Sequence, residues 1–388
     1  NRKQVLSPMK RFSTILLSAA FLSALLSSAA AWAIDIKARE YIILDFQTGT
    51  VLDAKDADRH MPPSSMSKLM TTYMVFQALK SGKISLEDKF TVSRHAWQEG
   101  GAASGGSTMF LDPGSKVKVE DLVRGMIIQS GNDACVALAE LIAGSEEVFA
   151  QMMTKEAQRL GMKNTNFMNA TGLPHPQHYS TAYDLALLAS AIIRDFPEYH
   201  PIYSTKEYRY NKITQANRNR LLWTDPTVDG MKTGYTENAG YCLITSAKRG
   251  ERRLLSVVLG TASESARAAE SQKLLNFGFQ NYDSVKLYES GQAVSGVPVW
   301  KGAAPEAKLG ALGPVFVAVP RGEGEFEVAE FGQSGGEVDG LAQEFAVKKR
   351  GLHVFIALQF PFHVGHFANE AALGFVGRAE FFGASGEQ

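Results

Sequence analysis

The feature that most constrains the fold is one predicted helix, which begins within the segment PPSSMSK at residues 62–68. Apolar side chains at positions 66, 69, 70, 73, 74 and 79 recur at helical spacing, and Gly82 predicts the end of the helix. Ser65 lies at the predicted helix start, where unpaired N–H groups and the helix dipole favour a developing negative charge. Lys68 follows three residues later and lies on the same face. A hydroxyl and an amine are therefore expected one helical turn apart.

Length and charge narrow the class of protein. The chain has 388 residues, and 45% of them are hydrophobic. This length exceeds the roughly 250 to 300 residues at which one hydrophobic core stops growing. We therefore expect two domains. Its 40 basic and 40 acidic residues give a formal net charge of zero, which argues against a nucleic-acid partner because there is no excess of cations.

Residues 1–33 have the pattern of upstream sequence followed by a cleavable export signal. Lys10 and Arg11 precede a mostly apolar stretch at residues 12–26, and the A-x-A pattern ends at Ala33. Met9 begins this signal, so residues 1–8 are expected to lie upstream of it, and the mature chain would start at Ile34. A membrane-spanning helix is the alternative, which five serines between residues 13 and 28 disfavour. Export leads to an oxidising compartment, but Cys135 and Cys242 lie in apolar segments and are predicted to be buried free thiols.

The order of the predicted elements indicates an α+β domain at residues 34–283, whose sheet joins distant parts of the chain. The expected strands are residues 39–45, a strand from residue 51, and residues 229–234, 240–246 and 253–259. The expected helices are residues 121–129, 134–142, 146–160, 182–193 and 265–278. A glycine-rich loop at residues 99–107 either lies on the plain surface or borders a site. Residues 284–388 are predicted to form a small β domain, in which His353, His363 and His366 lack convincing metal-ligand spacing.

Three short motifs occur in order: Ser65-x-x-Lys68, Ser130-x-Asn132 and Lys232-Thr233-Gly234. Each is weak alone, because residues 115–118 also read S-x-x-K and residues 80–82 also read K-S-G. Context excludes both decoys. The first lies in an alternating segment where its Ser and Lys would point to opposite faces of a strand, and the second lies at the end of the predicted helix.

The ordered set resembles the serine penicillin-recognising enzymes, which carry these three motifs. Residues 130–135, 180–184, 217–219 and 228–234 also match the pattern of the low-molecular-mass penicillin-binding proteins that are D-alanyl-D-alanine carboxypeptidases. The resemblance covers residues 34–283 strongly and extends weakly to residues 319–322. It implies a penicillin-binding transpeptidase or β-lactamase-like domain, in which an antiparallel sheet packs with a helical cluster, followed by a small mainly-β domain.

The chemistry of acyl transfer assigns roles to the first motif. Ser65 is a weak nucleophile without a base, and no His lies in the three motifs, so Lys68 is predicted to be that base. Its pKa must fall from about 10.4 by roughly 3 units, and burial beside Lys232 as a second cation can supply this.

The resemblance implies the remaining roles. Ser130 relays the proton to the leaving amine, and Asn132 holds the substrate amide and the base. The backbone N–H groups of Ser65 and Tyr235 form an oxyanion hole.

By the same resemblance, Thr233 and Arg218 hold the terminal carboxylate of the substrate, next to Gly234. Tyr235 departs from the pattern, because some family members have His there. That departure leaves pH dependence and leaving-group preference open.

The expected function is therefore periplasmic removal of the terminal D-alanine from the pentapeptide stem of peptidoglycan, with penicillins acylating the same serine and with no metal or organic cofactor. A class A β-lactamase is disfavoured because residues 172–180 hold no acidic residue. A peptidoglycan D,D-endopeptidase and a penicillin-binding sensor or scaffold without turnover stay open as alternatives. The tail at residues 378–388 has no apolar helical stripe for the membrane. Either the protein is free of the membrane, or the sequence after about Glu323 departs from the family, as after a shifted reading frame.

Overall fold

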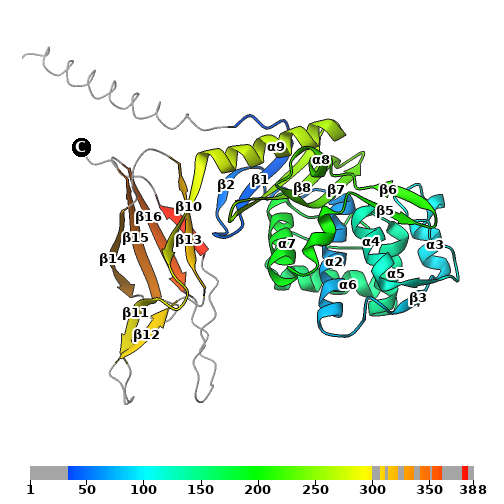
Figure 1. Cartoon of the computed structure of the whole chain (residues 1–388), viewed down its shortest axis with the longest axis horizontal. Coiled ribbons are helices and arrows are strands. Elements are labelled where there is room, and N and C mark those ends of the chain that lie inside the picture. Colours follow the sequence, from blue (N-terminus) through cyan, green and yellow to red (C-terminus); the bar gives the residue numbers. More distant parts are fainter. Residues whose placement is uncertain are drawn as a thin grey trace, which may run out of the picture. The chain divides into compact units, whose positions relative to one another are not determined.

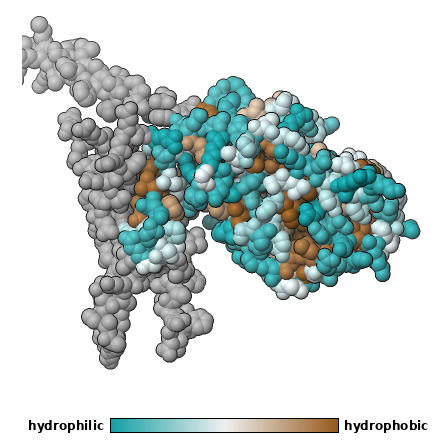
Figure 2. Space-filling view, viewed as in Figure 1, coloured by the Kyte–Doolittle hydropathy of each residue, from teal (hydrophilic) through white to brown (hydrophobic). Residues whose placement is uncertain are grey.

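The computed structural model describes residues 34–298, 306–310, 313–321, 327–335, 341–349, 352–360 and 378–382 (Figure 1). The predicted export signal, His363 and His366 lie outside these residues. No helix among the described residues is both long and apolar enough to cross a membrane. On the face shown in Figure 2, hydrophilic side chains cover most of the described part of the chain.

A five-stranded antiparallel sheet organises the larger region, in the order β2-β1-β9-β8-β7. Its strands are β1 (Glu40–Asp45), β2 (Val51–Lys55), β7 (Val228–Thr236), β8 (Gly240–Arg249) and β9 (Arg252–Thr261). The β1–β2 hairpin is confirmed, and β1 pairs with β9 although about 200 residues separate them, as in the pair Ile42 and Val257. The prediction of an α+β fold with a sheet built from distant segments is confirmed.

Helices cover both faces of this sheet (Figure 1). One is α9 (Glu264–Asn281), where Gly278 packs against Ile43 and Leu254. Ile42, Leu255 and Val257 face the opposite way and join the core of the helical cluster, as the alternation of side chains along a strand requires. The cluster comprises α2 (Lys68–Lys80), α4 (Val119–Ile128), α5 (Asn132–Ala143), α6 (Glu146–Arg159) and α7 (Ala182–Asp195).

The predicted start of the first helix is corrected by three residues. The α-helix α2 begins at Lys68, and Ser65 lies in the preceding 3-10 turn η1 (Ser64–Ser67). Ser64 has a φ of 48°, which prevents a regular α-helical start there. Ten of the 13 residues of α2 are buried, so the helix is a central core helix rather than an amphipathic surface helix.

Short elements surround the helical cluster. They are β3 (Lys89–Thr91), α3 (Arg94–Gly100), η2 (Ala102–Ser104), β4 (Lys116–Lys118), η3 (His200–Ser204), β5 (Glu207–Tyr210), β6 (Ile213–Ala216) and α8 (Leu221–Thr224). Both decoy lysines have ordinary partners. Lys118 of β4 pairs with Glu87 at 2.8 Å, and the Lys80 amine donates to the Asp195 carbonyl at 2.7 Å.

The chain after α9 is described as strands, which confirms the prediction of a mainly-β C-terminal part. The strand β10 (Tyr282–Tyr288) pairs with β13 (Val315–Pro320), and β11 (Ala293–Pro298) pairs with β12 (Glu306–Gly310). One further antiparallel sheet contains the strands β14 (Glu327–Gly335), β15 (Leu341–Lys349), β16 (Leu352–Phe360) and β17 (Arg378–Phe382). The sequence did not predict the positions of these individual strands. The division after Asp283 stays a prediction.

Asp133, in the first turn of α5, is a fully buried carboxylate that fixes the backbone before α4. It accepts hydrogen bonds from the Thr108 hydroxyl at 2.6 Å, the Met109 N–H at 2.9 Å and the Leu111 N–H at 3.0 Å. A buried donor that loses its acceptor costs the full desolvation of that group.

We predict that Asp133→Ala lowers the free energy of unfolding by about 3 kcal/mol or more, because three donors lose their acceptor. Thermal and urea unfolding measure the loss. Asp112→Ala is the control, since that exposed side chain makes one long contact with Asn211 at 3.3 Å. Equal stability of the two variants would contradict the prediction.

Candidate active site

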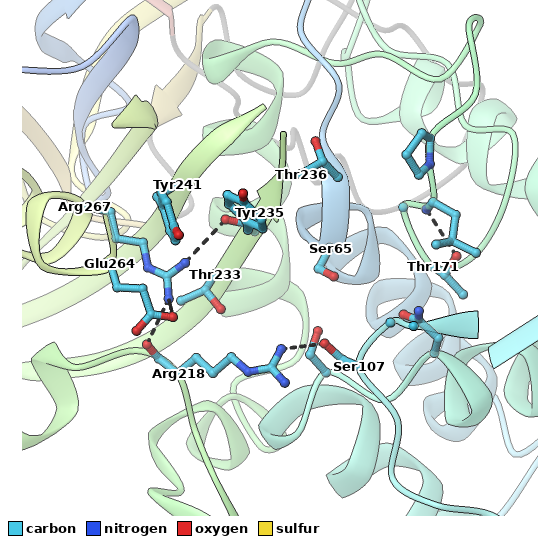
Figure 3. Close-up of a pocket in the computed structure, with 18 residues that line it drawn as sticks. Ser65, Ser107, Thr171, Arg218, Thr233, Tyr235, Thr236, Tyr241, Glu264 and Arg267 are labelled. Atoms are coloured by element: carbon cyan, nitrogen blue, oxygen red, sulfur yellow. Dashed lines mark hydrogen bonds and ion pairs between the residues drawn. The ribbon is translucent and has the colours of Figure 1, made fainter. Parts of the chain in front are cut away.

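The three predicted motifs line one cavity of about 410 Å³ (Figure 3). Ser65 comes from η1, Ser130 and Asn132 from the junction of α4 and α5, and Thr233 from β7. One proline and several glycines form part of its wall. The cavity also includes Gly105, Gly106, Ser107, Thr171, Gly172, Leu173, Pro174, Arg218, Gly234, Tyr235, Thr236, Tyr241, Glu264 and Arg267.

Ser65 and Lys68 form a hydrogen-bonded pair, as their spacing predicts. The Lys68 amine donates to the Ser65 hydroxyl oxygen at 3.0 Å and also to the carbonyl of Thr171. The Lys68 residue is only 1% exposed, so its amine is removed from bulk water. A buried amine next to a hydroxyl is an arrangement that can take a proton from it.

Lys232 and Ser130 form a second pair of the same kind. The Lys232 amine donates to the Ser130 hydroxyl oxygen at 3.0 Å and to the Thr233 carbonyl at 3.1 Å. Ser130 has a φ of 62°, in the left-handed region that residues with a side chain rarely adopt. Such strained residues concentrate at functional sites, where the surrounding structure holds them.

Burial lowers the pKa of both lysines. The pKa of Lys68 falls from 10.5 to about 8, mainly through burial, and the charge of Arg218 lowers it further. The pKa of Lys232 falls well below 10.5, through burial first and the charge of Lys68 second. The prediction named Lys232 as the cation that acts on Lys68. The charges of the two buried lysines do act on each other, since Lys68 lowers the pKa of Lys232, and Arg218 lowers the pKa of both.

Two glycines let the backbone close tightly around the nucleophile turn. Gly172 has a φ of 85°, and a Cβ there would lie 1.7 Å from the carbonyl oxygen of Ser64. A Cβ on Gly234 would lie 2.2 Å from the Ser64 hydroxyl oxygen. The third position of the Lys-Thr-Gly motif therefore needs glycine for this close approach.

One end of the cavity carries positive charge. Arg218 is exposed, and its guanidinium donates to the Ser107 hydroxyl (Figure 3). Its two neighbours hold it in place, since the Asn219 side chain donates to the Gly230 carbonyl at 3.0 Å and the Asn217 side chain accepts from the Asn219 N–H at 3.0 Å. These contacts explain why the segment Asn-Arg-Asn presents an arginine to the cavity.

The remaining predicted residues occupy the cavity in different ways. Asn132 is 4% exposed, and its side-chain amide packs against Gly106. Tyr235 is 50% exposed and packs its ring against Tyr241 at 4.4 Å between ring centroids. The Tyr235 side chain therefore lies at the mouth of the cavity.

Sequence reasoning missed part of the cavity wall. Arg267 of α9 is 3% exposed and lies 3.5 Å from the carbonyls of Gly234 and Arg218, with Glu264 at 3.6 Å (Figure 3). Nothing in the local sequence of α9 distinguishes this arginine from a surface charge. The sequence pattern did not indicate Thr171 either, although this residue directly precedes the loop at residues 172–180. The glycine-rich loop at residues 99–107, by contrast, borders the site through Gly105, Gly106 and Ser107.

Both cysteines are buried free thiols, as predicted. No group of three His, Cys, Asp or Glu residues in the described part of the chain could hold a metal ion. The cavity itself is lined by serine and threonine hydroxyls and by two arginines, and two lysine amines are buried next to its serines.

Comparison with known proteins places this fold and site among the serine penicillin-recognising enzymes. The family described as D-alanyl-D-alanine carboxypeptidase, peptidase family S11, matches residues 27–263. The family described as the C-terminal domain of penicillin-binding protein 5 matches residues 282–329. The chain belongs to the D-alanyl-D-alanine carboxypeptidase family.

Individual relatives support this membership. The chain is 47% identical to the D-alanyl-D-alanine carboxypeptidase DacC of Escherichia coli over 290 residues, which cover 74% of the chain and 72% of the relative. It is 46% identical to DacA of Haemophilus influenzae, over 74% and 73% of the two chains. Among solved structures, penicillin-binding protein 5 of Haemophilus influenzae superposes with a TM-score of 0.75 at 40% identity, covering 82% of this chain and 95% of that one.

His178 lies behind the nucleophile turn and predicts a pH dependence of stability. Its Nε2 lies 2.9 Å from the Ser67 hydroxyl oxygen, and the residue is 4% exposed. Burial, followed by the charges of His175 and Lys68, lowers its pKa from 6.5 to about 4. The unfolded chain therefore binds this proton more readily than the folded protein between these two pH values.

We predict that the contribution of His178 to stability is complete above about pH 6.5 and is lost as the pH falls toward about 4, by about 3 kcal/mol in all. Urea unfolding at several pH values measures it, and His178→Gln is expected to flatten the dependence. His175→Gln, at an exposed position on the same loop, is the control. Parallel profiles for the wild type and His178→Gln would refute this assignment.

Proposed function

We propose that this protein is a serine D-alanyl-D-alanine carboxypeptidase that removes the terminal D-alanine from the pentapeptide stem of peptidoglycan, and that penicillins acylate the same serine. The observation that carries the proposal is the pairing of Ser65 with the buried amine of Lys68 at 3.0 Å, next to a cavity that is also lined by Ser130, the partner of Lys232. This is the geometry of an activated nucleophile with a proton relay beside it.

Attack requires the neutral form of Lys68. With a pKa of about 8, roughly one Lys68 in ten is neutral at pH 7. The neutral amine takes the Ser65 proton while the hydroxyl oxygen forms a bond to the carbonyl carbon between the two D-alanines. The carbonyl becomes an oxyanion, and the backbone N–H groups of Ser65 and Tyr235 would receive it, which is consistent with both residues lining the cavity.

Collapse of this intermediate releases the terminal D-alanine. The proton held by Lys68 passes through the Ser130 hydroxyl to the leaving nitrogen, and the carbon–nitrogen bond breaks. An ester to Ser65 remains, with Asn132 beside it to hold the substrate amide. Water then hydrolyses the ester, and the serine regains its proton.

The substrate is oriented by its free carboxylate. Thr233 and Arg218 lie at the same end of the cavity, where the guanidinium supplies a charge and a fork of donors (Figure 3). This arrangement supports a carboxypeptidase, because the terminal D-alanine of a pentapeptide stem carries the free carboxylate that such a site would bind. The curated relatives named above are carboxypeptidases, which supports the same choice.

The setting of the enzyme is part of the proposal. Residues 1–33 would direct export to the periplasm, residues 34–283 would form the catalytic domain, and residues 284–388 the small β domain. The second family match ends at residue 329, so the sequence beyond it lacks support from the family. We therefore propose a periplasmic enzyme, and peripheral contact with the inner membrane is a separate question for membrane fractionation.

We predict that Ser65→Ala abolishes both D-alanine release from a pentapeptide and covalent labelling by fluorescent penicillin, with an activity loss of about 10³-fold or more. Ser67→Ala, two residues away, is the matched control, since the Ser67 hydroxyl faces His178 rather than the cavity. If the wild-type protein is labelled by penicillin but releases no D-alanine, the result would favour a penicillin-binding sensor or scaffold without turnover. Labelling of Ser65→Ala would remove Ser65 as the nucleophile.

We predict that the rate of penicillin acylation rises by about tenfold per pH unit below about pH 8 and levels off above it, because the neutral fraction of Lys68 follows its pKa. Stopped-flow labelling measures the rate. Lys68→Arg, whose side chain stays charged, should lose acylation across the range. A rate that is independent of pH between about 6 and about 8 would exclude Lys68 as the base.

A further inference from the structure

The loop at residues 169–173 controls the environment of the proposed base. Its Thr171 carbonyl accepts a hydrogen bond from the Lys68 amine, the second described contact of that amine besides the Ser65 hydroxyl. The direction of the Lys68 side chain therefore depends on where this carbonyl points. Thr171, Gly172 and Leu173 also form part of the cavity wall.

One side chain outside the cavity determines the shape of this loop. The Asn169 Oδ1 accepts from the N–H groups of Thr171 at 3.3 Å, Gly172 at 2.7 Å and Leu173 at 3.1 Å, and from the Thr171 hydroxyl at 3.1 Å. Its Nδ2 donates to the Leu173 carbonyl at 3.0 Å. The Asn169 side chain thus satisfies backbone groups that regular secondary structure would satisfy elsewhere.

Neighbouring contacts fix the start of the loop next to Asn169. The Ala170 N–H donates to the Glu146 carboxylate at 2.9 Å, and the Ala170 carbonyl accepts from the Thr71 hydroxyl at 2.6 Å. The other end is confined as well, since Gly172 packs against the Ser64 carbonyl. Between these two points, the orientation of the Thr171 peptide depends on the Asn169 side chain.

We propose that Asn169 is a positioning residue for the reaction: by folding residues 171–173 around its amide, it aims the Thr171 carbonyl at Lys68 and so places the amine against the Ser65 hydroxyl. This inference rests on the proposed function, because it assigns Asn169 to the acylation step. A misplacement of about 1 Å at a reacting group can lower a rate by about a hundredfold, which makes such a residue visible in kinetics.

The pH dependence of acylation is the readout that separates positioning from stability alone, and several charged or titratable groups influence it. The charges that act on the Lys68 amine are those of Cys135, Arg218, Asp133 and Glu146, and the charge of Lys68 acts in turn on Lys232 and His178. Asn169 is uncharged, so its removal leaves this set intact. Asn169→Asp retains the oxygen that accepts four hydrogen bonds but adds one negative charge to the set.

The test measures the acylation rate constant with fluorescent penicillin from about pH 6 to about pH 9.5, with the thermal midpoint of unfolding of each variant. Asn169→Ala should acylate about tenfold to a hundredfold more slowly even at the alkaline plateau, where Lys68 is neutral. Asn169→Asp should recover most of the plateau rate. The pH midpoint of its acylation should move to higher pH, because the new carboxylate favours the Lys68 ammonium. Asn166→Ala is the matched control, since that amide donates to the exposed Gln177 carbonyl at 2.6 Å outside the loop and should behave as wild type.

Wild-type acylation and a wild-type pH midpoint in Asn169→Ala would overturn the inference. If Asn169→Ala does not fold, Asn169→Asp decides. A folded Asn169→Asp with the wild-type rate and midpoint would overturn the inference, and an alkaline shift with a recovered plateau would support it. Failure of the wild type to acylate at any pH would overturn the proposed function itself, which distinguishes the two failures.

Discussion

The site depends on the removal of two lysine amines from water. In solution both amines would be protonated, and neither could take a proton from a hydroxyl. Burial disfavours the charged form, and it does so for both Lys68 and Lys232, each 3.0 Å from the hydroxyl oxygen of a serine that lines the cavity. The hydrogen bonds to Ser65 and Ser130 compensate part of the lost hydration. This balance keeps a reactive amine inside a folded protein.

The packing of the fold maintains that burial. The base begins α2, the most enclosed helix of the cluster, while Lys232 comes from β7 at the edge of the sheet. Ser130 itself has a left-handed backbone conformation, at the turn between α4 and α5. The glycines at positions 172 and 234 permit the approach of backbone to backbone that excludes water, since any side chain there would meet Ser64. Protein interiors tolerate few voids, so these elements hold one another in register.

The cavity divides its work between two ends. Arg218 and the buried Arg267 give one end its positive charge, whereas the opposite wall is a loop folded around an uncharged amide. Tyr235 lies between them at the mouth, half exposed and packed on Tyr241. The family membership of the chain agrees with this division, because an anion at one end and an acyl group at the other are what a carboxypeptidase must bind.

The sequence by itself determined the strands of the large sheet and the long helices of residues 34–283 to within a few residues, the three motifs and the rejection of two decoys, because these follow from local periodicity and spacing. It placed Lys68 within reach of Ser65, since three residues make one turn of helix. It could not identify Arg267, whose neighbours in space are distant in the sequence. It could not identify Asn169 either, which lies in a loop without a repeating pattern. The tertiary structure alone decided that Ser65 lies in a 3-10 turn, that Arg218 adds its charge near the base, and that both amines are buried. Burial is a property of what other segments bring to a residue, and no local stretch of sequence contains that information.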